Sequence, residues 1–559
     1  MALASLYQWV TGTSGHKYLA PRRHRQRYVP WLETFEERTV PSTVTVANNH
    51  DSGAGSLRQA ILDTNAVAGE DTIVFANSVR NIKLTSGELI ISDSLVIDGP
   101  GADQLTISGN NASRIFNISS GTVKIADLTI TKGLADGNAP NFASTGGGIL
   151  NQAEASLTLD NVGLVNNRAV GDSTAVTATS PVFVLKGGAL GGGLANFGTL
   201  AVVDCAFTSN LTLGANDTVG GTFGVEPAFP GLAGGGAISN HGTANIDGTE
   251  FNHNMAKAGN RGTGDFATIG GGGAIFNDSV LTVTDSSFKE NAAHGGDKGV
   301  SAYHNGHALG GAINSGSLLP VVGGGASLTV SKSTFDRNKA IGGNDNKVTL
   351  PVVTKSDGPN NAYGGGILVF QGTATISQSW LHHNQAIGGK GGGDNNGSLG
   401  VGGGIFFYNF IGGVIASVDD CVINHNNAIG GMGRNGGRGG DGLGGGIAMG
   451  SLDSIFSGPG VLTVSNSILA FNRACGGAGA RGGNGGHGFG GGLYNYIGST
   501  TTVEYSAILS NQAKGGKGKG GGINGLGIGG GVYNLGIFLN VMSVIDHNSA
   551  STSNDDTFG

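Results

Sequence analysis

The sequence is poor in the residues that hold small exported domains together. It has 3 Cys, 12 Pro and 3 Trp in 559 residues. Three cysteines cannot all pair, and we interpret Cys205, Cys421 and Cys475 as unpaired packing residues rather than a disulfide framework or a metal site. No stretch approaches the roughly 18 apolar residues of a membrane-spanning helix. The first 20 residues also contain no convincing signal-peptide core.

Charge is scarce as well. Charged residues make up 12% of the chain, and the net charge is −7. This balance gives no support to a nucleic-acid partner, which would require a basic surface. Glycine is the exception to the scarcity, with 108 residues, far above the usual share of about 7%. Most of the excess lies in a repeat.

The repeat occurs ten times between Gly146 and Asn548. Each copy has a glycine cluster, an aliphatic residue and a strand-like run that ends on Asn. Units of this size cannot bury their apolar residues alone, so the repeat predicts a stacked array. The repeated asparagines, which we call the ladder asparagines, are Asn167, Asn210, Asn254, Asn291, Asn338, Asn384, Asn426, Asn472, Asn511 and Asn548.

The spacing before each ladder asparagine predicts the shape of one unit. Apolar residues stand ten and eight positions before it, as in Leu281 and Val283, which is the two-residue period of a strand with one buried face. Phe, Leu or Ile stands three positions before it, as in Phe288. Short strands at angles to one another build the coil of a right-handed parallel β-helix, and we predict this all-β fold.

We expect the ladder asparagines to face the interior, where stacked amides satisfy one another. The alternative is that some of them only occupy left-handed turns. A second, shorter column of the same kind is predicted for Asn151, Asn196, Asn240, Asn277, Asn495 and Asn534.

Long glycine-rich excursions separate the units, and five of them have the same length. Two have glycine at every third residue, from Gly430 to Gly442 and from Gly476 to Gly488. That period is typical of a polyproline II helix. Flexible glycine loops are the alternative interpretation.

Four segments are predicted along the chain. Residues 1–42 form a disordered basic segment related to export, and residues 43–144 form an N-terminal cap with the first irregular coils. Within this cap, Ser56 is a plausible N-cap for a helix whose apolar residues are Leu57, Ile61 and Leu62. The repeat β-helix covers 145–550, and 551–559 is a polar tail.

Two motifs resemble known families. Gly272-Gly-Ala-Ile275 followed by Phe288-Lys-Glu-Asn291 is similar to the repeats of chlamydial polymorphic outer-membrane proteins, although their membrane barrel is absent here. The segment 51–61 resembles a short motif of bacterial right-handed β-helix proteins, and 32–42 resembles an N-terminal motif of exported planctomycete proteins. These resemblances imply a bacterial, exported or cell-surface solenoid of the pectin-lyase-like fold, without implying an activity.

Candidate sites for chemistry are incomplete in the sequence. Asp419-Asp420 and the His487 of Gly-His-Gly match two pieces of a polygalacturonase-like site, but no Arg-Ile-Lys follows. One stretch around Asp441 fits a Ca²⁺-binding nonapeptide without tandem copies. His383 and His425 each precede a ladder asparagine, so they are either outward structural residues or a metal pair. We predict no cofactor, with Ca²⁺ as the open alternative.

Basic residues in the late excursions form a candidate anion- or glycan-binding strip, if the coils stack in register; the alternative is that they only solubilise glycine loops. The strip consists of Lys390, Arg434, Arg438, Arg481, Lys514, Lys517 and Lys519. The sequence thus predicts a non-enzymatic, adhesin-like or structural surface protein that binds polysaccharide or another surface component. The alternative is a polysaccharide lyase or glycoside hydrolase, which would need clustered acids beside a basic residue.

Overall fold

A computed structural model describes residues 42–559 apart from 138–143, 175, 181–182, 221–228, 317–325, 350–357, 393–394, 410–412 and 453–457. The chain divides into Met1–Val40 and Pro41–Gly559, and everything below concerns the second unit. The predicted disordered segment 1–42 lies outside the described residues except for Ser42.

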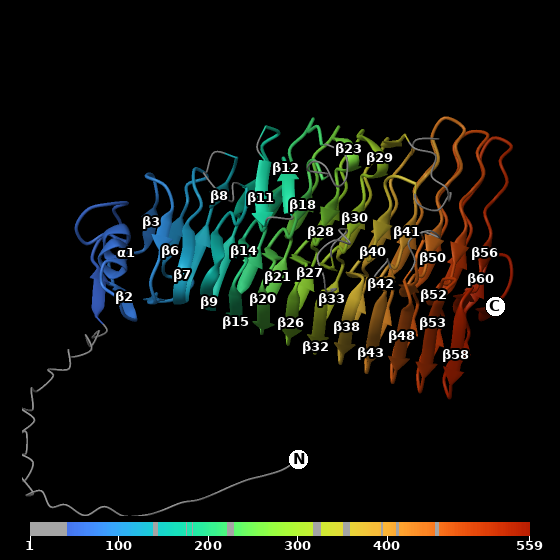
Figure 1. Cartoon of the computed structure of the whole chain (residues 1–559). Coiled ribbons are helices and arrows are strands. Elements are labelled where there is room, and N and C mark those ends of the chain that lie inside the picture. Colours follow the sequence, from blue (N-terminus) through green and yellow to red (C-terminus); the bar gives the residue numbers. More distant parts are fainter. Residues whose placement is uncertain are drawn as a thin grey trace, which may run out of the picture. The chain divides into compact units, whose positions relative to one another are not determined.

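One coil of the repeat shows how the strands are arranged. β25 (Ile275–Asn277), β26 (Val280–Thr284), β27 (Ser287–Lys289) and β28 (Ala292–His294) follow one another around the coil. Each pairs in parallel and in register with its counterpart one coil later, as Phe288 with Phe335. The colours in Figure 1 follow this order from coil to coil. The predicted parallel β-helix is confirmed.

The repeated strands form four columns. The first contains β14 (Leu194–Asn196), β19 (Ile238–Asn240), β25, β31 (Ile313–Ser315), β37 (Ile367–Phe370), β42 (Ile405–Tyr408), β47 (Ile447–Met449), β52 (Leu493–Asn495) and β57 (Val532–Asn534). The second contains β15 (Thr199–Val203), β20 (Thr243–Asp247), β26, β32 (Ser327–Ser331), β38 (Gly372–Ser377), β43 (Val414–Asp419), β48 (Gly460–Ser465), β53 (Ser499–Glu504) and β58 (Ile537–Val541). The third contains β16 (Ala206–Thr208), β21 (Glu250–Asn252), β27, β33 (Thr334–Asp336), β39 (Trp380–His382), β44 (Val422–Asn424), β49 (Ile468–Ala470), β54 (Ala507–Leu509) and β59 (Val544–Asp546).

The fourth column is a separate parallel sheet. It contains β8 (Leu134–Ala135), β10 (Arg168–Val170), β17 (Leu211–Leu213), β22 (Met255–Lys257), β28, β34 (Lys339–Ile341), β40 (Gln385–Ile387), β45 (Asn427–Ile429), β50 (Arg473–Cys475), β55 (Gln512–Lys514) and β60 (Ser549–Ala550). A sheet of two-residue strands accompanies it: β13 (Ala189–Leu190), β18 (Ala233–Gly234), β24 (Gly270–Gly271), β30 (Ala308–Leu309), β36 (Ala362–Tyr363), β41 (Gly400–Val401), β46 (Gly442–Leu443), β51 (Gly488–Phe489) and β56 (Gly527–Ile528).

The first coils are less regular. Here β7 (Phe116–Thr131) and β9 (Ile149–Val165) each run through three columns and pair with one another. The other strands before the repeat are β1 (Thr43–Val46), β2 (Asp71–Phe75), β3 (Asn81–Lys83), β4 (Leu89–Ile91), β5 (Leu95–Asp98) and β6 (Thr106–Ser108). Strands in the excursions and at the end are β11 (Val176–Ser180), β12 (Phe183–Lys186), β23 (Thr263–Ala267), β29 (Val300–Asn305), β35 (Lys347–Val348) and β61 (Thr557–Phe558).

A helix, α1 (Leu57–Asn65), stands where the sequence predicts one. Ser56 is its N-cap, and its side chain accepts a hydrogen bond from the Gln59 amide. Leu57 and Ile61 are buried in the core, whereas Leu62 is exposed. That this helix closes the first coil stays a prediction.

The interior is filled by residues that repeat from coil to coil. The rings of Phe207, Phe251, Phe288 and Phe335 are stacked, with centroids 4.6–5.0 Å apart. Offset aromatic stacks of this kind add to the stability gained by burying apolar area. Beside them the ladder asparagines are buried, and the Nδ2 atom of each donates to Oδ1 of the next, as Asn254 does to Asn291 over 3.0 Å.

The glycine-rich excursions of the last coils are ordered layers rather than independent loops. Backbone amides link one excursion to the next, from Gly477 to the Gly440 carbonyl over 2.8 Å and from Gly516 to the Gly486 carbonyl over 2.8 Å. A side chain at these positions would collide with a neighbouring carbonyl. Glycine at every third residue is therefore explained by close backbone packing. Within the described chain, no helix is both long and apolar enough to cross a bilayer.

Candidate functional site

The third strand column presents one face to the solvent, which we call the short-strand face. In each strand of three residues the middle side chain points inward and the two flanking side chains point outward, because side chains alternate along a strand. β3 and β6 join this column at its N-terminal end through β7. The face thus runs along the described coils from Asn81 to Asp546.

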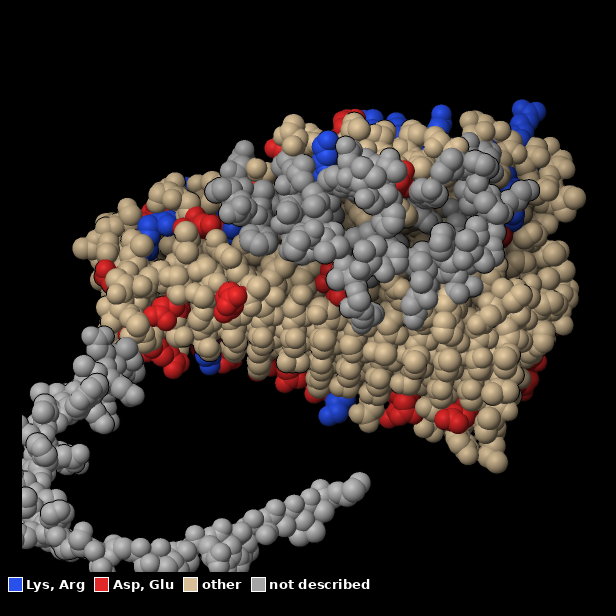
Figure 2. Space-filling view, in the orientation of Figure 1, with Lys and Arg blue, Asp and Glu red and all other residues tan. Residues whose placement is uncertain are grey.

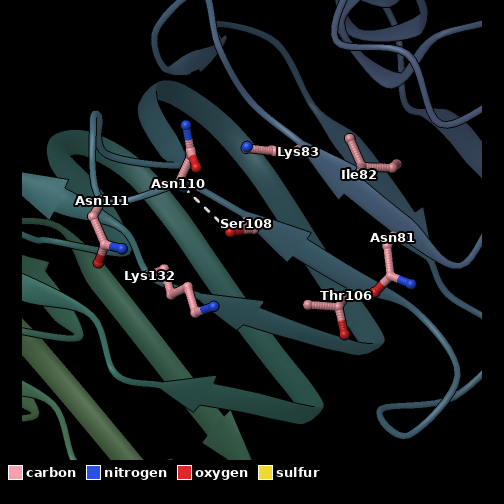
Figure 3. Close-up of a pocket in the computed structure, with 8 residues that line it drawn as sticks. All are labelled: Asn81, Ile82, Lys83, Thr106, Ser108, Asn110, Asn111 and Lys132. Carbon is pink, nitrogen blue, oxygen red and sulfur yellow. Dashed lines mark hydrogen bonds between the residues drawn. The ribbon is translucent and has the colours of Figure 1, made fainter.

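A pocket of about 320 Å³ opens on this face in the first coils. Asn81 and Lys83 of β3 and Thr106 and Ser108 of β6 contribute side chains, and Lys132 follows β7. Figure 3 shows Ser108 between the two lysines. The volume falls within the range of small-ligand sites. Amides, hydroxyls and ammonium groups can bind a ligand that carries hydroxyls and a negative charge.

The turn after β6 shapes one wall of this pocket. Asn110 and Asn111 both adopt left-handed backbone conformations, with φ of 58° and 55°, which asparagine tolerates better than most residues. The Asn110 amide donates to Ser108 Oγ over 3.2 Å, as Figure 3 shows. No carboxylate lines the pocket, and neither lysine forms an ion pair within the described part of the chain. The sequence analysis missed this site because its residues follow no motif.

A second cluster lies further along the same face. Asp336 of β33 is in register with His382 of β39, and His383 follows directly. The Nδ1 atoms of the two histidines are 3.1 Å apart, and Asp336 Oδ1 lies 3.1 Å from Nδ1 of His382 and 3.6 Å from Nδ1 of His383. Burial lowers the pKa of His382 below its usual value, against the opposing charge of Asp336.

The turn at the end of β39 brings the two histidines together. Neighbouring residues of an extended strand point to opposite sides, but His383 has a left-handed backbone with φ of 57°. Its ring stacks on His425 of the next coil, with centroids 5.2 Å apart. His383 and His425 are therefore neighbours on successive coils, as the sequence analysis anticipated. The sequence analysis did not identify Asp336, because only the strand register places it beside the histidines.

The other predicted chemical residues are engaged in structural contacts. Asp419 accepts hydrogen bonds from Ser465 Oγ and Asn466 Nδ2, which lower its pKa. Asp441 accepts from Arg438 over 2.5 Å and from the His487 amide over 2.6 Å. Both carboxylates are thus engaged in structural contacts through Oδ1, and the Ca²⁺ alternative stays a prediction.

The candidate basic strip is partly neutralised. Arg434 forms an ion pair with Asp345 at 2.6 Å, and Arg438 forms one with Asp441 at 2.5 Å. Lys519 lies beside Arg481 through a parallel bridge between their excursions. Figure 2 shows lysine and arginine side chains gathered along the edge of the molecule where the excursions lie. Lys390, Lys514 and Lys517 form no ion pair among the residues that the structure describes.

Comparison with known proteins gives a limited result. No protein-family profile and no curated protein matches the chain. Among solved structures, it is similar to a mannuronic-acid-specific polysaccharide lyase of family 6 from human gut microbiota, with 10% identity over 84% of this chain and 88% of that one and a TM-score of 0.32. It is also similar to an alginate lyase in complex with G6, with 11% identity, coverage of 84% and 86% and a TM-score of 0.27. A PL6 alginate lyase has 10% identity, coverage of 89% of both chains and a TM-score of 0.19.

These neighbours correct one prediction of the sequence analysis. The chain was expected to lack catalysis, whereas the solved structures named above are polysaccharide lyases, so that expectation is wrong and is withdrawn. At this similarity they transfer no substrate and no catalytic residue. The resemblances to chlamydial and planctomycete proteins stay predictions.

Proposed function

We propose that this protein is an exported enzyme that acts on an acidic polysaccharide, bound along the short-strand face. The pocket carries the proposal. Two lysines, Lys83 and Lys132, stand among amide and hydroxyl side chains with no carboxylate in the lining. Sugar hydroxyls can bond to the amides, and an ammonium group can pair with a uronate carboxylate.

The rest of the face suits a linear polymer. Successive coils repeat about every 4.8 Å along the axis, so a chain laid across them meets many similar contacts. Trp380 lies on this face next but one to His382, and 61% of its surface is exposed. Its flat ring offers an apolar surface with an N–H donor at its edge, which suits the face of a sugar ring.

The composition of the pocket favours elimination over hydrolysis. Hydrolysis of a glycosidic bond generally uses a pair of carboxylates on either side of the bond, and none of the described residues that line this pocket carries a carboxylate. Elimination removes the proton from the carbon beside the uronate carboxylate, breaks the bond from the next carbon to the glycosidic oxygen and forms a C=C bond, while the leaving oxygen takes up a proton to become a hydroxyl. Cations that neutralise the carboxylate stabilise the charge that develops. Lys83 and Lys132 are the residues that we assign to this neutralisation.

An assay of the purified full chain against uronate-containing, sulfated and neutral polysaccharides tests the proposal. We expect unsaturated products, seen by ultraviolet absorbance, from a uronate polymer. Lys83→Ala and Lys132→Ala should each lower the rate at least about tenfold, as loss of a charge-stabilising group does. Lys124→Ala is the matched control, because Lys124 is a surface lysine of the same region that pairs with Asp160 at 2.8 Å.

Detection of new reducing ends without unsaturated products would show that the enzyme cleaves the polymer by hydrolysis and not by elimination. Absence of any product, together with unchanged retention of the lysine variants on polysaccharide gels, would refute the proposed function.

The basic strip is proposed as a secondary contact. Neutralising Lys514, Lys517 and Lys519 together should then weaken the salt dependence of polysaccharide binding, while unchanged binding would argue for a role in solubility alone.

A further inference from the structure

The cluster of Asp336, His382 and His383 has the shape of a metal-binding triad. Its three facing atoms, Oδ1 and the two Nδ1, are separated by 3.1, 3.1 and 3.6 Å. A tetrahedral ion with bonds of about 2.0–2.1 Å requires its ligand atoms to stand about 3.3–3.4 Å apart. The three ligand atoms therefore already lie close to the separations that a bound tetrahedral ion would require.

The carboxylate oxygen that faces the histidines lacks a hydrogen bond. Asp336 Oδ1 is buried and accepts none, although Nδ1 of His382 lies within 3.1 Å. Buried oxygen atoms that accept no hydrogen bond are rare, because their desolvation is uncompensated. A cation between Oδ1 and the two imidazoles would remove this cost.

Neighbouring residues hold the three groups in place. Arg337 binds the other oxygen of Asp336, with Nη1 2.6 Å from Oδ2, so that Oδ1 is turned toward the histidines. The stack on His425 fixes the ring of His383. Such support around a metal ligand sets its orientation and strengthens binding.

We propose that Asp336, His382 and His383 bind a divalent transition-metal ion, with Zn²⁺ as the ion that the donor set favours. Imidazole nitrogens suit Zn²⁺ better than Ca²⁺ or Mg²⁺, which take oxygen ligands. Three protein ligands leave a position open, as in zinc sites that bind water or substrate. The side chain of His383 is 48% exposed, so solvent or a ligand on the short-strand face can reach the open coordination position of the ion.

The site stands on this geometry alone and does not depend on the proposed polysaccharide activity. Metal binding is therefore measured on the full chain without polysaccharide. After treatment with a chelator and its removal, titration calorimetry with ZnCl₂ should give one equivalent bound. Co²⁺ should produce the visible absorption bands of a tetrahedral site, and Zn²⁺ should abolish them.

Variants locate the ion. His382→Ala, His383→Ala and Asp336→Asn should each weaken Zn²⁺ binding at least about tenfold, since even outer-shell changes cost 10–100-fold. His547→Ala is the matched control. In another coil Asp546 occupies the position of His382 and His547 that of His383, with His547 Nδ1 3.0 Å from Asp546 Oδ2, so this pair contains one histidine instead of two.

The Zn²⁺ affinities of these variants decide the proposal. Unchanged affinity in all three ligand variants, with thermal unfolding showing that they are folded, would overturn the proposal. An equal loss of Zn²⁺ affinity in His547→Ala would also overturn it, because the ion would then bind to scattered surface histidines. Loss confined to the triad variants supports the site whether or not any polysaccharide is cleaved.

Discussion

Asn291 shows how one residue satisfies several buried groups at once. Its Nδ2 atom donates to Asn338 Oδ1 over 2.9 Å and to the Phe251 carbonyl over 2.8 Å. Its Oδ1 atom accepts from both the amide and Nδ2 of Asn254, each over 3.0 Å. A side chain with both donors and an acceptor is needed here, so Ser or Ala cannot replace it without leaving partners unpaired.

Replacing this residue should therefore be costly. Asn291→Ala leaves buried groups of Asn254 without an acceptor, and we expect the free energy of unfolding to fall by at least about 2 kcal/mol. Denaturant titration followed by circular dichroism measures it. Asn252→Ala is the control. Among the residues that the structure describes, the Asn252 side chain bonds only to exposed Glu250, over 3.2 Å, and the change should stay within about 0.5 kcal/mol. Equal effects of the two substitutions would contradict the role of the ladder.

At the scale of elements, the carboxylate of Asp51 is one of the groups that attach α1 to the first coils. Asp51 Oδ1 lies 3.0 Å from Nη2 of Arg58 on the helix, and its Oδ2 accepts from Thr85 over 3.1 Å and from Ser86. Burial alone would raise the pKa of Asp51, but the hydrogen bonds from Ser86, Arg58 and Thr85 outweigh it and lower the pKa from 3.8 to about 2.

This shift makes the attachment of the helix dependent on pH. Because the folded pKa lies below the unfolded value, the stabilisation is complete above pH 3.8 and is lost as the pH falls through about 2. We expect the stability difference between the wild type and Asp51→Asn to be largest near neutral pH and to shrink toward pH 2. Urea titrations at several pH values measure it. A difference that does not vary with pH would show that Asp51 acts only through packing.

At the scale of the whole described unit, the coils are joined by two systems of contacts. The strand columns and their interior form one, and the glycine excursions of the last coils form the other. In the second system the Gly486 amide donates to the Gly477 carbonyl over 2.9 Å, and the Gly486 carbonyl accepts from Gly516 over 2.8 Å. One residue thus connects neighbouring coils without any side chain.

A methyl group at this position should separate the layers. The added carbon of Gly486→Ala would collide with the Gly440 carbonyl, and overpacking of this kind costs about 1–3 kcal/mol. We expect a lower midpoint of thermal unfolding. Gly358→Ala is the control, since its added carbon would meet no atom of the described residues within 4 Å. If both variants melt like the wild type, the excursions contribute nothing to stability.

The sequence by itself determined the repeat and its columns, because the three-residue spacing from an apolar residue such as Phe288 to the ladder asparagine, here Asn291, is local and recurs in every unit. It also placed His383 beside His425, since both hold the same position of successive units. Only the tertiary structure decided the rest. The glycine layers form through backbone bonds between excursions far apart in the chain, as between Gly516 and Gly486. The pocket at Lys83 and Lys132 and the approach of Asp336 to two histidines follow from strand register and left-handed turns, which side-chain periodicity does not encode.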